Sequence, residues 1–99
     1  MKKALVFLAD GCEMCEALCV VDVLRRGGVA VTIAGVGKES VISSHKVEIK
    51  ADCVLSQDLS RSWDLVFCPG GMPGATNLSS SDLVNSIIME NYREGRIVS

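Results

Sequence analysis

The sequence predicts an α/β fold with a mostly parallel sheet, and three observations support this. First, residues 4–8 are a short, continuously apolar run, as expected for a strand buried on both faces, and residues 29–34 (VAVTIA) read as a second apolar strand. Second, the segment between them favours a helix, and such a strand–helix–strand unit implies a parallel pair with a right-handed crossover. Third, another apolar run at residues 65–68 is followed by a helical stripe, so the alternation continues along the chain.

The first helix is predicted from about Cys12 to Arg26. Glu13 and Glu16 lie in its first turn and two arginines in its last, which suits the helix dipole. The glycine pair Gly27-Gly28 then ends the helix before the second strand begins.

Short and polar segments occupy the middle of the chain. Val41-Ile42 and Val47 to Ile49 read as two short strands, paired as a hairpin around Ser43 to His45. Residues 51–62 are polar and rich in turn formers, and we expect a short helix near Leu55 to Leu59.

The last third of the chain predicts a capped helix and the start of a strand. Ser79 to Ser81 offer N-cap side chains, and a helical stripe of apolar residues follows and ends at Gly95: Leu83, Val84, Ile87, Ile88 and Tyr92. A further strand starts at Arg96. We therefore expect residues 1–99 to be the amino-terminal part of one larger domain. Alone, this part is expected to aggregate or stay molten, because its sheet lacks a neighbour at one edge.

Composition limits the possible partners. The net charge is −2 and no basic block stands out, so we expect no nucleic-acid partner. The longest apolar-rich stretch, Cys15 to Leu24, is too short to span a bilayer and contains two acids, so we expect no membrane association. Five cysteines in an aliphatic-rich chain indicate reduced thiols and a cytoplasmic location rather than a disulfide scaffold.

Several segments carry a family likeness. They are residues 3–11 (KALVFLADG) with Glu13 and Glu16, residues 21–28 (VDVLRRGG), residues 31–35 (VTIAG), residues 64–71 (DLVFCPGG) with Gly74-Ala75 and Asn77-Leu78, and residues 95–98 (GRIV). In this order and with few gaps, they resemble the DJ-1/PfpI (ThiJ) family over nearly the whole chain. The first block and the Pro-Gly-Gly block are specific together, whereas either alone is weak.

The resemblance implies a flavodoxin-like, doubly wound, three-layer α/β/α fold, incomplete in this chain and usually assembled as a homodimer. The family's catalytic cysteine follows the strand that begins at Arg96, so we expect these residues alone to be inactive and to need the carboxy-terminal half of the domain. Members are described as glyoxalase-like hydratases or as protein or nucleotide deglycases. Close relatives also bear the name thiazole monophosphate biosynthesis protein.

We therefore expect the amino-terminal part of a cysteine-dependent protein that acts on reactive carbonyls, with a small aldehyde or a glycated molecule as substrate. The alternatives are a non-enzymatic redox-stress or chaperone-like protein, and a PfpI-type cysteine peptidase. Neither a cofactor nor a metal ion is expected.

Glu16 is the main candidate for chemistry. Helical spacing places it on one face with Cys19, Val20 and Val23, and a carboxyl group among apolar neighbours can retain a proton and donate it. The resemblance implies that this glutamate contacts the nucleophilic thiolate and relays protons during attack on an aldehyde. The structural alternative is an acid in the first helical turn that only favours the helix dipole.

Gly70 and Gly71 follow a buried strand and precede a helix. Glycine lets the backbone approach a ligand closely, and the resemblance implies that these amides form an oxyanion pocket beside the nucleophile. Without the resemblance, Pro69-Gly70-Gly71 is an ordinary turn between a strand and a helix.

The remaining candidates are interpreted as structural. Cys12, Cys15 and Cys19 form part of a helical stripe, where free cysteine packs as a small hydrophobe, although Cys12 at the helix start is expected to have a lowered pKa. His45 reads as a solvated loop residue, and Arg25-Arg26 as helix-terminal charge. The methionines read as surface or gap-filling residues: Met14, Met72 and Met89.

Overall fold

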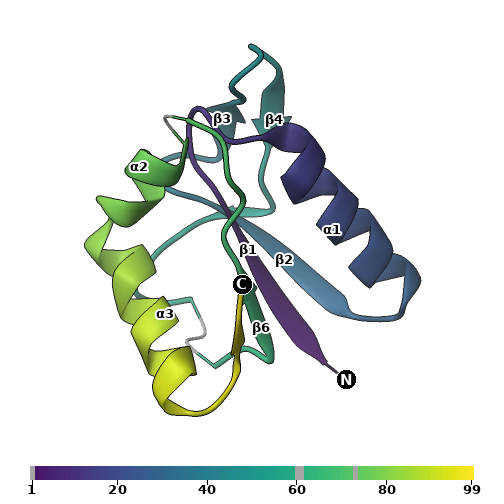
Figure 1. The fold of residues 1–99 in the computed structure, drawn as a ribbon, viewed down its shortest axis with the longest axis vertical. Helices are drawn as coiled ribbons and strands as arrows, with labels where there is room; N and C mark the ends of the chain where they lie inside the picture. Colours follow the sequence, from purple (N-terminus) through teal and green to yellow (C-terminus); the bar gives the residue numbers. More distant parts are fainter. Residues whose placement is uncertain (1, 60–61, 73) are drawn as a thin grey trace.

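A computed structural model describes residues 2–59, 62–72 and 74–99 of the chain. Within these ranges, five strands form one sheet in the order β5–β2–β1–β6–β7, and every neighbouring pair is parallel (Figure 1). The strands are β1 (Lys3–Leu8), β2 (Ala30–Gly35), β5 (Cys53–Val54), β6 (Leu65–Phe67) and β7 (Ile97–Val98). The predicted parallel α/β fold is confirmed.

Helices cover both faces of the sheet. Helix α1 (Met14–Arg26) lies on one side, and α2 (Gly74–Ser79) and α3 (Asp82–Arg93) lie on the other (Figure 1). The central strand β1 is apolar at successive positions because its side chains alternate between two buried layers. One layer contains Leu5 and Phe7, and the other contains Val6 and Leu8.

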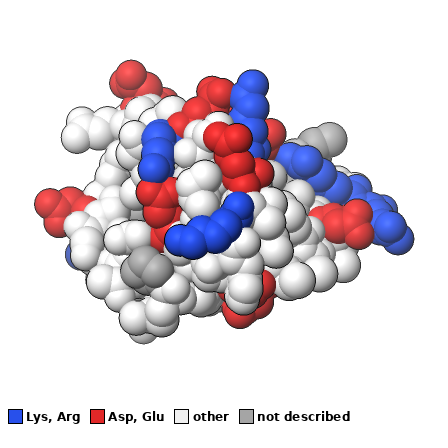
Figure 2. Space-filling view, turned by 90° about the horizontal axis from the view of Figure 1, so that it is seen from above, with Lys and Arg blue, Asp and Glu red and all other residues white. Residues whose placement is uncertain are grey.

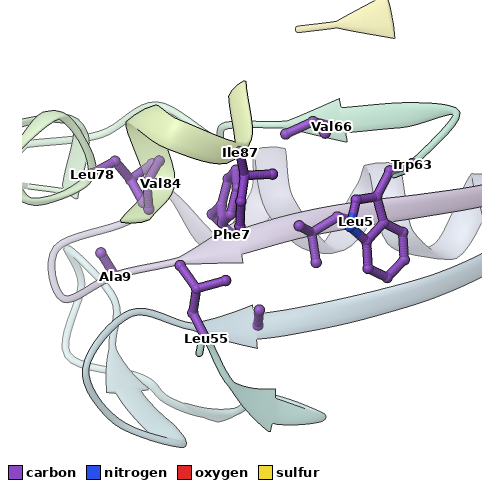
Figure 3. Packing of buried hydrophobic residues seen from close by; sticks show 10 residues of the cluster. Leu5, Phe7, Ala9, Leu55, Trp63, Val66, Leu78, Val84 and Ile87 are labelled. Atoms are coloured by element: carbon purple, nitrogen blue, oxygen red, sulfur yellow. The ribbon is translucent and has the colours of Figure 1, made fainter. Parts of the chain in front are cut away.

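The larger core layer joins the sheet to α2 and α3. Figure 3 shows Phe7 of β1 beside Val84 and Ile87 of α3, with Leu5 and Trp63 further along the strand. The buried members of this layer are Leu5, Phe7, Ala9, Ala34, Leu55, Trp63, Val66, Leu78, Val84 and Ile87. Full burial of each large aliphatic or aromatic side chain contributes roughly 1.5–3 kcal/mol of transfer free energy. This layer therefore fixes α2 and α3 on the sheet.

Helix α1 begins two residues later than predicted. Glu13 caps it, because its Oε1 accepts a hydrogen bond from the backbone N–H of Cys15 at 3.0 Å. Cys12 therefore precedes the helix and lies in the loop after β1. At the other end, Gly27 caps the helix and Gly28 follows with a φ of 84°, as the predicted glycine stop requires.

The middle of the chain contains one confirmed prediction and one error. Strands β3 (Ser40–Ile42) and β4 (Glu48–Lys50) pair antiparallel as the expected hairpin. The helix predicted near Leu55 to Leu59 is wrong: the backbone forms turns there, and β5 precedes them. The Leu55 N–H extends the ladder with β2 by donating to the Gly35 carbonyl at 2.8 Å, and residues 60–61 lie outside the described chain.

Helix α3 has the predicted cap but a shifted buried face. The Ser81 side chain accepts a hydrogen bond from the Val84 N–H at 3.3 Å. Tyr92, predicted to face the core, is 69% exposed, and Asn91 is buried instead. Asn91 satisfies its amide by accepting from the Trp63 N–H and donating to the Ile87 carbonyl. A buried polar side chain with both partners is stable there.

Charged side chains of both signs intermingle on the face drawn in Figure 2. Ion pairs of the described residues include Arg25 with Asp52 and Arg96 with Asp64. Among the described residues, none of the helices has the length and apolar character needed to cross a bilayer.

Candidate functional site

The strand order places a switch point between β1 and β6. Within the sheet, β2 is the neighbour of β1 on one side, and β6 is its neighbour on the other side. In open α/β sheets, ligands bind outside the carboxyl ends of the strands at such a point. Here that edge is formed by the loop after β1, residues 9–13, and by the turn that starts at Cys68 after β6.

Glu16 and Gly70 meet at this edge. The Gly70 N–H donates a hydrogen bond to Oε1 of Glu16 at 3.2 Å. In return, the Gly70 carbonyl accepts a hydrogen bond from the Glu13 N–H at 2.9 Å. A Cβ atom on Gly70 would lie 3.0 Å from Oε1 of Glu16, so the carboxylate approaches the bare backbone closely. The structure thus brings two of the three predicted site residues into direct contact.

Gly71 completes the turn for a steric reason. Its φ is 95°, and a Cβ atom there would lie 2.6 Å from the backbone nitrogen of Glu13. Gly74, the first residue of α2, is equally close to the loop, because a Cβ atom would lie 2.7 Å from the Cys12 nitrogen. Only residues without side chains allow this turn to pack against the loop after β1.

The Gly70 amide already has a partner in this structure. Its N–H points to Glu16, so an oxyanion at this position would share that donor with the carboxylate or displace it. The two predicted roles, Glu16 as acid or base and Gly70 as an oxyanion donor, are therefore coupled through one hydrogen bond.

The expected apolar surroundings of Glu16 differ in the structure. Cys19 is exposed and Val23 is 66% exposed, so the face that they share with Glu16 is not part of the core. The buried residues of α1 are Ala17 and Val21. Glu16 is itself exposed, and its carboxylate contacts the Gly70 turn rather than an apolar surface, so the predicted apolar environment is wrong.

Asp10 and Asn77 support the loop and were not predicted as site residues. Asn77 donates from Nδ2 to the Asp10 carbonyl at 2.7 Å, which ties α2 to the loop after β1. The Asp10 carboxylate accepts from Lys38 and from the Ile42 N–H at 3.0 Å. The hydrogen bond from Lys38, assisted by that from Ile42, lowers the pKa of Asp10. The available signal was an acidic residue two positions after the end of a buried strand.

The prediction for Cys12 is wrong. It is almost fully buried, and desolvation raises the pKa of its thiol, with a smaller contribution from the negative charges of Asp10 and Glu13. Burial also raises the pKa values of Cys53 and Cys68. Cys15 and Cys19 of α1 were predicted to pack in the core, and this prediction is wrong because both are exposed.

An apolar hollow of about 280 Å³ opens beside the Gly70 turn. Its lining includes Cys68, Leu78, Val84 and Ile88. A second hollow, about 290 Å³ and more polar, lies next to the loop after β1 and includes Asp10, Ser44 and Met72 in its lining. Both hollows adjoin segments that form the candidate site.

The other predicted structural residues lie outside the site. His45 is exposed, and its Nδ1 lies 3.1 Å from Oγ of Ser44. Arg26 pairs with Asp22 on the surface of α1. Within the described ranges, no three His, Cys, Asp or Glu side chains converge into a metal-binding group.

The fold and the site define a doubly wound α/β protein in which a helical carboxylate is held at the switch point of the sheet. The chain belongs to the DJ-1/PfpI family, whose sequence profile matches residues 2–99.

Individual relatives agree with this assignment. The Parkinson disease protein 7 homolog of Danio rerio is 45% identical over 97 residues, which are 96% of this chain and 50% of the relative. The glutathione-independent glyoxalase DJR-1.2 of Caenorhabditis elegans is 29% identical over 98 residues, covering 98% of this chain and 52% of that protein. The crystal structure of Drosophila melanogaster DJ-1beta superposes with a TM-score of 0.93 at 40% identity, covering 98% of this chain and 53% of that one. The chain spans about half the length of these relatives.

Proposed function

We propose that this chain supplies the acid/base half of a cysteine-dependent active site that converts 2-oxoaldehydes such as methylglyoxal to 2-hydroxy acids. The observation that carries the proposal is the contact between Glu16 and the Gly70 amide at the switch point. The likeness to a relative named as a glyoxalase supports the choice of substrate class. The nucleophilic cysteine would come from the carboxy-terminal half of the domain.

The proposed reaction starts with addition of the thiolate to the aldehyde carbon. A C–S bond forms, the carbonyl electrons move to oxygen, and a proton from Glu16 yields a thiohemiacetal. The hydrogen on C1 then moves to C2 while the hydroxyl proton moves from the C1 oxygen to the C2 oxygen, which gives a thioester of lactate. Water cleaves the C–S bond and releases lactate, and the thiol returns its proton to the Glu16 carboxylate, so that the thiolate and the acid are both restored. The net change is the addition of one water molecule to methylglyoxal.

The backbone turn would help at the first step. Negative charge develops on the aldehyde oxygen as the thiolate adds, and amide N–H groups at a fixed turn stabilise such charge. Gly70 and Gly71 are proposed to serve in this way. Because the Gly70 N–H also contacts Glu16, proton transfer from the carboxyl group and binding of the oxyanion would occur at neighbouring positions.

The test is an assay of lactate formation from methylglyoxal with the full-length protein and its Glu16→Ala variant. Loss of a general acid or base lowers turnover by a factor on the order of 10² to 10⁴. Glu94→Ala is the matched control, because Glu94 is an exposed glutamate at the end of α3, just before β7 begins, and so lies at the opposite edge of the sheet from the Gly70 turn. Turnover by Glu16→Ala equal to that of the control would refute the proposal.

The proposed assembly and location follow from the family alone. We propose a homodimer in the cytoplasm, where a reducing environment suits the cysteines described here, all of which are free thiols. Light scattering on the full-length protein tests the dimer: a mass of one chain at micromolar concentration would contradict it.

A further inference from the structure

The candidate site forms where two separate segments of the chain meet. One segment is the loop after β1, residues 9–13, which continues into α1 and so carries Glu16. The other is the Gly70 turn with α2, which are joined by the hydrogen bond from the Ala75 N–H to the Gly71 carbonyl at 2.8 Å. The contact between Glu16 and the Gly70 amide spans the two segments, so its geometry depends on how they are held together.

Helix α2 holds the loop through two consecutive carbonyls. The Gly74 N–H donates to the Gly11 carbonyl at 3.2 Å, and Nδ2 of Asn77 donates to the Asp10 carbonyl at 2.7 Å. Gly74 and Asn77 are three positions apart, so they lie on the same face of the helix. The Asn77 contact is the shorter of the two. Its donor is a side-chain amide, so a substitution can remove this hydrogen bond and leave the backbone unchanged.

The other contacts across this junction are mostly made by the backbone. The Glu13 N–H donates to the Gly70 carbonyl at 2.9 Å, and the loop lies too close to Gly71 and Gly74 for either to carry a Cβ atom. Within the described ranges, Glu16 and Asn77 supply the side-chain hydrogen bonds between the two segments. Asn77 contacts neither Glu16 nor Gly70 through its hydrogen bond, so it can act on them only through the position of the loop.

We propose that Asn77 is a positioning residue: its hydrogen bond to the Asp10 carbonyl keeps the loop after β1 against the Gly70 turn, and thereby keeps Glu16 in contact with the Gly70 amide. The inference rests on the proposed function, in which Glu16 transfers a proton beside the oxyanion amides. A displacement near 1 Å at a reacting group can cost about 10²-fold in rate. The backbone contacts persist without Asn77, so we expect a smaller loss of about 10-fold.

The kinetic test compares lactate formation by the full-length protein and its Asn77→Ala variant. We expect kcat for methylglyoxal to fall by about 10-fold and KM to change by less than about twofold, because the reacting groups move while the substrate contacts remain. Asn77→Asp keeps the shape of the side chain but turns an acceptor towards the carbonyl, so at least the same loss is expected.

Ser80→Ala is the matched control for both variants. The exposed Ser80 hydroxyl also donates to a backbone carbonyl, that of Thr76 at 2.9 Å, but this hydrogen bond lies within the α2 segment and does not reach the loop after β1. We expect its kcat and KM to equal those of the wild type. A difference between Asn77→Ala and Ser80→Ala therefore reports the junction rather than the loss of a surface hydrogen bond.

A second measurement detects the Glu16 contact without turnover. In full-length protein labelled with ¹⁵N-glycine, the N–H resonance of Gly70 reports its hydrogen bond to Glu16, and Glu16→Ala gives the resonance position without that bond. We expect Asn77→Ala to move the resonance at least halfway to that position, and Ser80→Ala to leave it in place. If Asn77 only stabilised the fold, the melting temperature would fall and the resonance would not move.

Either of two results would overturn the proposal: a Gly70 resonance in Asn77→Ala that matches the wild type, or a kcat equal to that of Ser80→Ala. If the wild type forms no lactate, the proposed function fails separately. The Gly70 resonance then still decides whether Asn77 positions Glu16.

Discussion

The backbone N–H of Gly70 donates to Oε1 of Glu16 at 3.2 Å and thereby joins residues that are 54 positions apart in the chain. The Glu13 N–H donates to the carbonyl of the same glycine, so two hydrogen bonds connect the start of α1 to the turn after β6. The orientation of the Glu16 side chain therefore depends on Gly70, a residue without a side chain.

Gly70→Ala is predicted to reduce activity much more than stability. The added Cβ atom would lie 3.0 and 3.3 Å from the two carboxylate oxygens of Glu16, so the flexible end of that side chain must move. Because a displacement near 1 Å at a reacting group can cost about 10²-fold, we expect methylglyoxal turnover to fall by roughly 10- to 100-fold. The melting temperature should change by only about 4 °C or less. Turnover equal to that of the wild type would show that this contact does not matter.

Gly71→Ala is predicted to destabilise the fold. Its positive φ is strained for alanine, and the added Cβ atom would lie 2.6 Å from the backbone nitrogen of Glu13, which cannot move aside cheaply. Such strain costs about 1–3 kcal/mol, measurable by urea unfolding. Gly28→Ala is the control: its φ is also positive, but nothing lies within 4 Å of the added atom. An equal loss of unfolding free energy in both variants would rule out the close approach at Gly71 as the cause.

Asp10 is predicted to stabilise the fold in a pH-dependent manner. Its pKa is lower in the folded chain because of hydrogen bonds from Lys38 and Ile42. A carboxyl with a lowered pKa stabilises the fold above its unfolded pKa of about 3.9, and this contribution is lost as the pH falls through the folded pKa.

The variant Asp10→Asn should therefore be less stable than the wild type at pH 7, by about 1 kcal/mol or less because the carboxylate is partly exposed. The difference should shrink as the pH drops below about 4, as followed by thermal unfolding. Asp22→Asn, which removes only a surface pair with Arg26, serves as the control. A difference that stays constant from pH 7 to pH 3 would contradict the assignment.

The cysteines are predicted to react in an order set by burial. Cys15 and Cys19 should be alkylated quickly, and Cys12 slowly, because it is buried and its pKa is raised. Iodoacetamide labelling at pH 7.5 with peptide mass spectrometry gives the three rates. In mild urea that opens the fold, the rate for Cys12 should approach the others. Fast labelling of Cys12 in the native protein would show that the loop after β1 is open.

Local patterns predicted most of the fold. Apolar runs identified β1, β2 and β6 because strands buried on both faces need no partner information to be recognised. The errors arose where contacts with residues distant in the sequence determine the local structure. Leu55 follows β5 and not a helix because its N–H completes the ladder with Gly35, and Asn91 is buried because the Trp63 backbone supplies its partner. Neither pairing is visible in a local window.

The site was only partly predictable. The glycines and Glu16 were identified from a family likeness, since spacing alone does not bring positions 16 and 70 together. Helical periodicity placed Cys15 and Cys19 on a stripe but could not say which stripe faces the sheet, and the structure buries Ala17 and Val21 instead. An acid shortly after a buried strand was a sequence signal for Asp10, but its contacts with Lys38 and Asn77 depend on the fold and could not be predicted.

An experimental structure of the full-length, reduced protein tests the central claim most directly, because it measures the distance from the Glu16 carboxylate to the nearest thiol of the carboxy-terminal half. We predict a cysteine Sγ within about 3–3.5 Å of a Glu16 oxygen, at hydrogen-bonding distance, and beside the amides of Gly70 and Gly71. A structure with no thiol near this carboxylate, or with Glu16 turned away from Gly70 into solvent, would contradict the account.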